Sequence, residues 1–248
     1  TRIISGIVMG AIVAAVLALG FLWEPIVITI AIALLAAGAV YELLHNAVGI
    51  KCKLSLILAC VFSFYVPFTR FIHEDLGVCL IFVLFGAIVY SVAAAIMILK
   101  NHSEFGLGQI AAFYGLPIMY SGMFFCLSGV INNASGIYYL LLLLNFSSVC
   151  DMGAYFTGVT CGKHKLCPNI SPKKTVEGAI GGIASSVIVT VILCLCFSKS
   201  MLLPVILTVP FCILGMIGDL FASAIKRSVD LKDYGNLIPG HGGILDRV

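Results

Sequence analysis

The sequence predicts an all-α integral membrane protein, a polytopic bundle of transmembrane helices joined by short loops. Of its 248 residues, 61% are hydrophobic and only 10% are charged, and the mean hydropathy is +1.16. An ordinary soluble domain carries roughly 25% charged residues. Because a helix needs about 20 apolar residues to cross a bilayer, the chain has room for eight or nine spans, which we expect to form one domain over residues 1–248.

Apolar runs separated by charges, prolines and glycine clusters define eight spans. The first follows Arg2 and is long enough to cross the membrane, and it lacks the cleavage pattern of a signal peptide, so we expect a retained helix. The third is short, and Pro67 is expected to end it early. The predicted spans are 3–22, 26–44, 54–69, 76–99, 107–130, 137–158, 177–198 and 201–222.

The distribution of basic residues predicts the orientation of these spans. If the eight spans alternate in direction, twelve of the fourteen Lys and Arg residues fall on the side of the N-terminus, and only Arg70 and Lys199 fall on the other. Cytoplasmic loops carry such an excess. We therefore expect the N-terminus and the long polar segments 159–176 and 223–248 to face the cytoplasm of a prokaryotic host, at its plasma membrane. Loop charges of this kind do not indicate nucleic-acid binding.

The ten cysteines do not predict a disulfide framework. Most lie within apolar runs, where a thiol behaves as a small hydrophobic group. Cys161, His164 and Cys167 are close enough in sequence to suggest zinc. A fourth ligand with suitable spacing is absent, which disfavours that interpretation.

Three acidic residues are the main candidates for chemistry. Asp151 and Asp219 lie inside predicted spans, near their cytoplasmic ends, and Asp246 lies in the polar tail. Intramembrane acids are costly, so they indicate function by default, and carboxylates are ligands that Mg²⁺ prefers. The alternatives are a helix-end residue in contact with solvent for Asp219, an ion pair with Arg247 for Asp246, and a structural hydrogen bond or salt bridge for Asp151.

Lys173 and Lys174 precede a helix that is expected to start near Thr175, where ammonium groups and free backbone N–H groups together favour a phosphate. Fixing the topology, or attracting anionic lipid, is the alternative role for these lysines. In the tail, the Pro-Gly-His-Gly-Gly run at 239–243 allows backbone N–H groups to approach an anion. Glu42, near the end of the second span, either extends to the interface or pairs with a lysine of the site.

The tail follows the pattern S-x-x-K-R-x-x-x-x-K-D-x-G-x-x-x-P-G-H-G-G-x-x-D-R from Ser223 to Arg247. It resembles the signature of the phosphatidate cytidylyltransferase (CDP-diacylglycerol synthase) family. Further matches to that family are the Tyr41-Glu42 pair, Asp-Met-Gly-Ala-Tyr-Phe at 151–156, Ser-Pro-Lys-Lys-Thr-Val-Glu-Gly at 171–178 and Gly-Asp-Leu at 218–220. The family pattern continues with another aspartate and a last membrane helix. We therefore expect a ninth span beyond Val248 and a chain that is incomplete at its C-terminus relative to the family.

The resemblance implies that CTP and phosphatidate react to CDP-diacylglycerol and pyrophosphate, with Mg²⁺ required and a second cation as an option. It implies metal binding by Asp219 and Asp246, with Asp151 as a further member. It also implies phosphate binding and catalysis by Lys226, Arg227 and His241. The further residues expected to bind substrate phosphates are Lys173, Lys174, Ser223, Lys232, Gly240, Gly242 and Gly243.

Several alternatives remain at the level of sequence. A related cytidylyltransferase acting on another lipid phosphate would use the same head-group chemistry. A lipid or ion transporter would also place acids in a helical bundle, although it would favour a midplane site and internal repeats. A non-catalytic scaffold is disfavoured by the intact acids and lysines. A homodimer is compatible with such a bundle, but periodicity does not indicate an interface.

Overall fold

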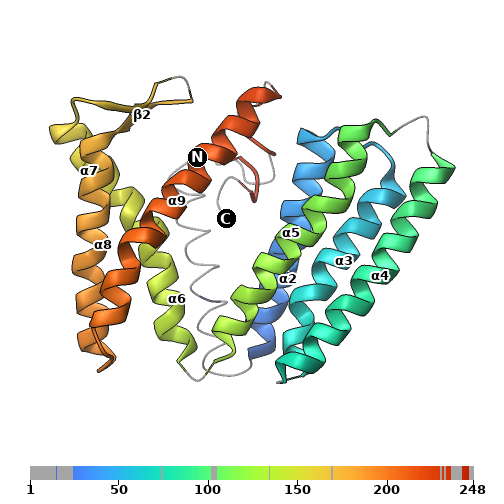
Figure 1. Ribbon diagram of the computed structural model, residues 1–248, viewed down its shortest axis with the longest axis horizontal. Coiled ribbons are helices and arrows are strands. Elements are labelled where there is room, and N and C mark those ends of the chain that lie inside the picture. Colours follow the sequence, from blue (N-terminus) through green and yellow to red (C-terminus); the bar gives the residue numbers. More distant parts are fainter. Residues whose placement is uncertain are drawn as a thin grey trace. The chain divides into compact units, whose positions relative to one another are not determined.

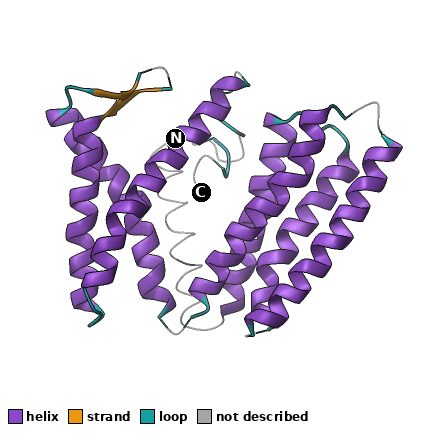
Figure 2. Cartoon of the chain, in the orientation of Figure 1, coloured by secondary structure: helices purple, strands orange, loops and turns teal. Residues whose placement is uncertain are grey.

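The computed structural model describes residues 15, 25–73, 75–101, 105–133, 135–168, 170–229, 231, 233–235 and 242–245. These residues are almost entirely helical (Figure 2). Seven helical segments within them are long and apolar enough to cross a membrane. The predicted first span, 3–22, lies outside the described residues apart from position 15.

The helices confirm the all-α bundle (Figure 1), and each of the other seven predicted spans falls on one of the helical segments. One predicted span, 137–158, is built from two α-helices joined by a π-helical turn. The helices are α2 (Pro25–Glu42), α3 (Lys53–Ile72), α4 (Leu76–Lys100), α5 (Leu107–Ile131), α6 (Gly136–Leu144), α7 (Cys150–Cys161), α8 (Val176–Cys196) and α9 (Leu202–Ser228), with π-helical turns η1 (Leu43–Ala47) and η3 (Asn145–Val149).

Pro67 does not end the third span, contrary to the prediction. It lies inside α3, which continues to Ile72. A proline removes one backbone donor, and a membrane helix tolerates this when neighbouring groups form compensating hydrogen bonds.

The chain divides into two compact units, which we describe separately. The first unit contains the described residues of Thr1–Ala134 together with those of Leu231–Val248. In it, α3 packs against α2, α4 and α5. Its core consists of apolar side chains from these helices and includes Phe62 stacked on Tyr90 with ring centroids 4.5 Å apart. The prediction of a single domain over 1–248 stays a prediction.

The second unit contains the described residues of Ser135–Asp230. Its closest helix pair is α7 and α8, and the residues that α8 buries recur at every fourth position: Gly178, Gly182, Ser186, Thr190 and Cys194. Small residues at this spacing allow two membrane helices to approach closely. A Cβ atom at Gly182 would lie 2.5 Å from the Cys150 carbonyl oxygen.

Polar side chains cross-link the helices of the second unit inside its apolar interior. Asn145, in η3, donates through Nδ2 to the Ser186 carbonyl at 3.0 Å and to the Thr190 hydroxyl at 2.9 Å. The Thr190 and Thr208 hydroxyls lie 2.8 Å apart. These bonds connect η3, α8 and α9, the elements that lead into the candidate site.

A small antiparallel hairpin, β1 (Lys165–Cys167) and β2 (Ser171–Thr175), connects α7 to α8. The hairpin was not predicted from the sequence, although the start of the following helix was. Helix α8 begins at Val176, and the Thr175 hydroxyl accepts a hydrogen bond from the Gly178 N–H at 3.1 Å as its N-cap. This cap fixes the end of β2, and with it the two lysines that precede Thr175.

Candidate active site

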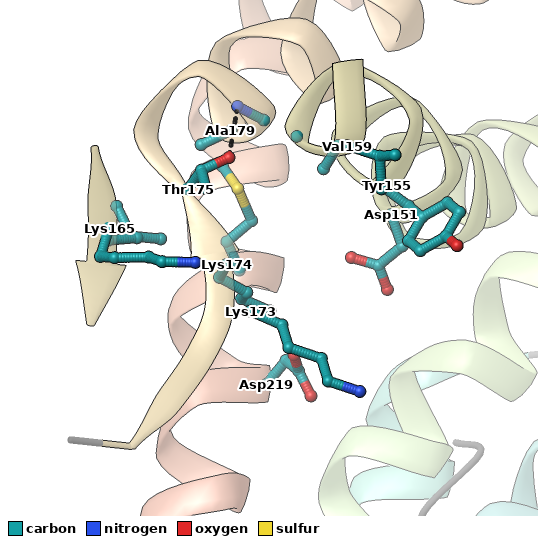
Figure 3. Close-up of a pocket in the computed structure, with 14 residues that line it drawn as sticks. Asp151, Tyr155, Val159, Lys165, Lys173, Lys174, Thr175, Ala179 and Asp219 are labelled. Carbon is teal, nitrogen blue, oxygen red and sulfur yellow. Dashed lines mark hydrogen bonds and ion pairs between the residues drawn. The ribbon is translucent and has the colours of Figure 1, made fainter. Parts of the chain in front are cut away.

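A cavity of about 460 Å³ lies in the second unit, where the hairpin meets the ends of three helices. Its size is typical of a small-molecule site. Figure 3 shows that Asp151 from α7, Asp219 from α9 and the lysines of the hairpin surround it. The lining is Asp151, Ala154, Tyr155, Gly158, Val159, Lys165, Leu166, Lys173, Lys174, Thr175, Gly178, Ala179, Met216 and Asp219.

The structure thus brings together four of the residues predicted to form the site. Asp151 and Asp219 lie 68 residues apart in the sequence, and the two lysines of β2 lie 45 and 46 residues before Asp219, yet all four line one cavity. Lys174 Nζ forms an ion pair with Asp219 Oδ2. The Lys174 ammonium group is thus a cation bound directly to the Asp219 carboxylate. The pair remains partly accessible, with 27% of the Lys174 side chain and 53% of the Asp219 side chain exposed.

The Glu177 carboxylate binds the loop that leads into the hairpin. Glu177 accepts hydrogen bonds from the backbone N–H groups of Lys163 and His164, both at 3.1 Å from Oε2. His164 Nδ1 also lies 2.6 Å from Glu177 Oε1. Because Glu177 is in the first turn of α8, it ties the end of α7 to the start of α8 around the cavity.

The donor set fits a magnesium ion better than zinc. Mg²⁺ commonly takes one or two carboxylates, with water and substrate phosphates completing its octahedron, and Asp151 and Asp219 are two carboxylates in one cavity. Within the described residues, no group of three or more His, Cys, Asp and Glu side chains is placed to hold a metal. His164 contacts Glu177 instead. Asp246, the third predicted ligand, lies outside the described residues.

A family comparison bears on this arrangement of acids and lysines. The model of the Cytidylyltransferase family matches residues 1–248, the whole of the sequence. The chain belongs to the cytidylyltransferase family.

Relatives within this family include bacterial proteins named phosphatidate cytidylyltransferase. One from Bacillus subtilis (strain 168) is 33% identical over 231 residues, which is 88% of this chain and 82% of the relative. One from Staphylococcus haemolyticus is 39% identical over 150 residues, or 60% of this chain and 56% of the relative. One from Staphylococcus saprophyticus is 40% identical over the same shares. The match thus spans little more than half the length of the staphylococcal relatives.

The cytidylyltransferase signature begins on α9 and continues into the tail. Ser223, Lys226 and Arg227 follow Asp219 by four, seven and eight residues, which places them on the same face of the helix. They are not among the residues that line the cavity. Lys232, Gly240 and His241 lie outside the described residues, as Asp246 does, so their predicted phosphate-binding and catalytic roles stay predictions.

Three glycines of the tail are described, Gly235, Gly242 and Gly243, and each stands where a larger residue would be strained or would clash. Gly242 has a φ of +90°, which L-residues rarely adopt. At Gly243, an added Cβ atom would collide with the Glu42 carboxylate. The group that approaches Gly243 most closely is therefore a carboxylate of α2, and its predicted phosphate-binding role stays a prediction.

Three features of this region were not found from the sequence. Lys165 and Tyr155 line the cavity, and Tyr155 falls in the Asp-Met-Gly-Ala-Tyr-Phe run that matched the family, which was the available signal. Among the described residues, Glu42 forms no ion pair with a lysine. Its side chain is 1% exposed and accepts hydrogen bonds from the tail backbone.

Proposed function

We propose that this chain is a CTP:phosphatidate cytidylyltransferase, which transfers CMP from CTP to phosphatidate and yields CDP-diacylglycerol and pyrophosphate. The observation that carries the proposal is the cavity in which Asp151 and Asp219 face Lys165, Lys173 and Lys174. The names of the bacterial relatives support the choice of substrates.

The reaction brings two anionic groups together. An oxygen of the phosphatidate phosphate attacks the α-phosphorus of CTP, and the bond from that phosphorus to the β-phosphate oxygen breaks, which releases pyrophosphate. The three lysines of the hairpin reduce the repulsion between these groups and stabilise charge on the leaving group. Phosphoryl-type transfer needs positioning and charge neutralisation more than proton transfer, and this matches a lining with lysines and carboxylates.

We propose that Asp151 and Asp219 hold Mg²⁺, with Asp246 as a further ligand on the strength of the signature alone. Bound Mg²⁺ would supply charge neutralisation at the phosphate oxygens. Lys174 already balances one carboxylate charge in the structure. The aromatic and aliphatic side chains of Tyr155, Val159 and Met216 give the same cavity an apolar wall, which suits a lipid substrate.

We further propose that the cavity opens toward the cytoplasm at a prokaryotic plasma membrane. The proposal rests on the count of basic residues along the sequence, since Lys163, Lys165, Lys173 and Lys174 all fall around the hairpin. CTP would then enter from water, and phosphatidate would enter from the adjacent leaflet.

The test is an assay of the purified full-length protein with labelled CTP, phosphatidate and Mg²⁺. We expect labelled CDP-diacylglycerol, loss of the product with EDTA, and recovery when Mg²⁺ is restored. Replacing Asp219 and Asp246 together by Ala should abolish the product. Absence of product from the wild-type protein, or full activity of the double variant, would refute the proposal. A panel of other lipid phosphates in the same assay distinguishes phosphatidate from related acceptors.

A further inference from the structure

Glu42 is a buried carboxylate that binds the backbone of the tail. It is the last residue of α2, inside a helix that is otherwise apolar. Oε1 accepts the Ile244 N–H at 2.9 Å and Oε2 accepts the Leu245 N–H at 2.9 Å. Both oxygens of one side chain are thus used on two consecutive backbone groups, 202 and 203 residues away in the chain.

The surrounding tail residues are shaped around this carboxylate. A Cβ atom at Gly235 would lie 2.6 Å from Glu42 Oε1, and one at Gly243 would collide with both oxygens. One turn further along, Asn46 in η1 donates through Nδ2 to the Tyr234 carbonyl at 2.6 Å. Tyr234 itself is 1% exposed. The end of α2 and η1 therefore hold the tail on both sides of residues 236–241.

A carboxylate in this position needs a reason, because an ionisable group inside an apolar helix is costly. A neutral amide or hydroxyl at this position could also accept a hydrogen bond from one N–H group, so one such bond would not explain why the residue is a carboxylate. A carboxylate has two acceptor oxygens and no donor, so each of the two N–H groups bonds to an oxygen of its own. The choice of residue thus matches the task of fixing two adjacent peptide groups.

We propose that Glu42 is a positioning residue for the signature tail: it fixes the backbone at Ile244 and Leu245, directly before Asp246 in the sequence. The inference rests on the proposed function, in which Asp246 is a metal ligand. Glu42 touches neither substrate nor metal in this scheme. It acts through the tail, and its removal should weaken metal use without disturbing the cavity of the second unit.

The first measurement does not depend on catalysis. Hydrogen exchange of the full-length protein, followed by mass spectrometry of a peptide that contains residues 242–245, should be faster by about tenfold or more in Glu42→Ala, as expected when hydrogen bonds to a charged acceptor are lost. Glu42→Gln keeps one acceptor oxygen and should lie between the two. Exchange in α4 should match the wild type, which separates loss of the tail from loss of the fold.

The second measurement is the Mg²⁺ dependence of activity. In Glu42→Gln and in Gly235→Ala, which pushes a methyl group against Glu42 Oε1, we expect kcat to fall about tenfold or more and half-maximal activity to need several-fold more Mg²⁺. The KM for phosphatidate should change less than about twofold. Gly122→Ala is the matched control, because in the described part of the chain no atom beyond its own stretch of helix lies within 4 Å of the added methyl group, and it should behave as wild type.

The outcomes separate this inference from the proposed function. If the wild-type protein makes no product but Glu42→Ala accelerates exchange at 242–245, the proposed function fails and the anchoring of the tail stands. If the wild type is active and the Glu42 and Gly235 variants keep wild-type exchange or wild-type Mg²⁺ dependence, the inference is overturned. If Glu42→Ala does not fold, Glu42→Gln and Gly235→Ala decide by the same two readouts.

Discussion

At the scale of single residues, the ion pair between Lys174 and Asp219 joins a group suited to bind a cation with a group suited to bind an anion. Asp219 is a carboxylate that a cation can bind, Lys174 is an ammonium group that an anion can bind, and in the structure the two bind each other. The partial exposure of both side chains keeps the strength of the pair low. Such a pair separates readily when a phosphate and a metal compete for its members.

Lys174→Gln is predicted to reduce kcat/KM for CTP by roughly tenfold to a hundredfold, because one of the charges that offsets the phosphates is lost. Steady-state kinetics with labelled CTP measures it. Lys199→Gln is the matched control: Lys199 is also in the second unit and also bound, to the Ser135 hydroxyl at 3.0 Å, but it does not line the cavity. Equal effects of the two substitutions would contradict the assignment of Lys174.

Asp151→Asn tests whether Asp151 binds metal or serves only the packing of α7. An amide keeps the shape and loses the charge, so a metal ligand would show a requirement for Mg²⁺ raised by about tenfold or more, with an unchanged unfolding temperature. A structural residue would show the reverse pattern. Titration of activity with Mg²⁺, beside thermal unfolding in detergent, distinguishes the two.

The sequence was sufficient to single out Asp151, Asp219, Lys173 and Lys174, because charges inside or beside apolar runs are conspicuous. It was not sufficient for Glu42. The partners of Glu42 are backbone N–H groups about two hundred residues away, and backbone groups leave no mark on composition or periodicity. Its proximity to the signature became visible only once the tail and α2 were seen in one unit.

At the scale of elements, the close packing of α7 and α8 positions the cavity. The stripe of small residues on α8 allows the two backbones to approach, and Glu177 and the Thr175 cap hold the hairpin at their ends. The apolar runs predicted these helices well. The hairpin was not predicted, because strands of three and five residues are too short to show a period.

Gly182→Ala is predicted to destabilise the second unit by about 1–3 kcal/mol, since its methyl group would overlap the Cys150 carbonyl oxygen and press on Ala154. Thermal unfolding in detergent should show a lower midpoint. The comparison is Gly122→Ala on α5, where the methyl group has free space and alanine is the better helix former. The packing argument is wrong if both variants unfold at the wild-type temperature.

At the scale of the whole molecule, the signature is shared between two units. Asp219 and the start of the signature on α9 belong to the second, whereas Leu231 and the tail beyond it belong to the first. Apolar runs predict helices but not which helices group together, since grouping depends on contacts between distant side chains. For this reason the helices could be predicted from the sequence, whereas the division into two units could not.

The orientation proposed for the membrane can be tested on native cysteines. Cys161, at the end of α7, and Cys196, at the end of α8, are both exposed and lie at opposite ends of their adjacent spans. A membrane-impermeant maleimide applied to intact cells should modify Cys196 and spare Cys161, and should modify both after permeabilisation. Mass spectrometry of the labelled peptides gives the readout. The inverse pattern would place the hairpin outside the cell.

The contact between Glu42 and the tail cannot form until the tail has been synthesised, long after Glu42 itself has been made. The ribosome adds about 5–20 residues each second, and Ile244 follows Glu42 by 202 residues, so the carboxylate enters the bilayer about 10–40 seconds before its partners exist. The first unit is therefore the last to be completed, after every residue of the second has been made.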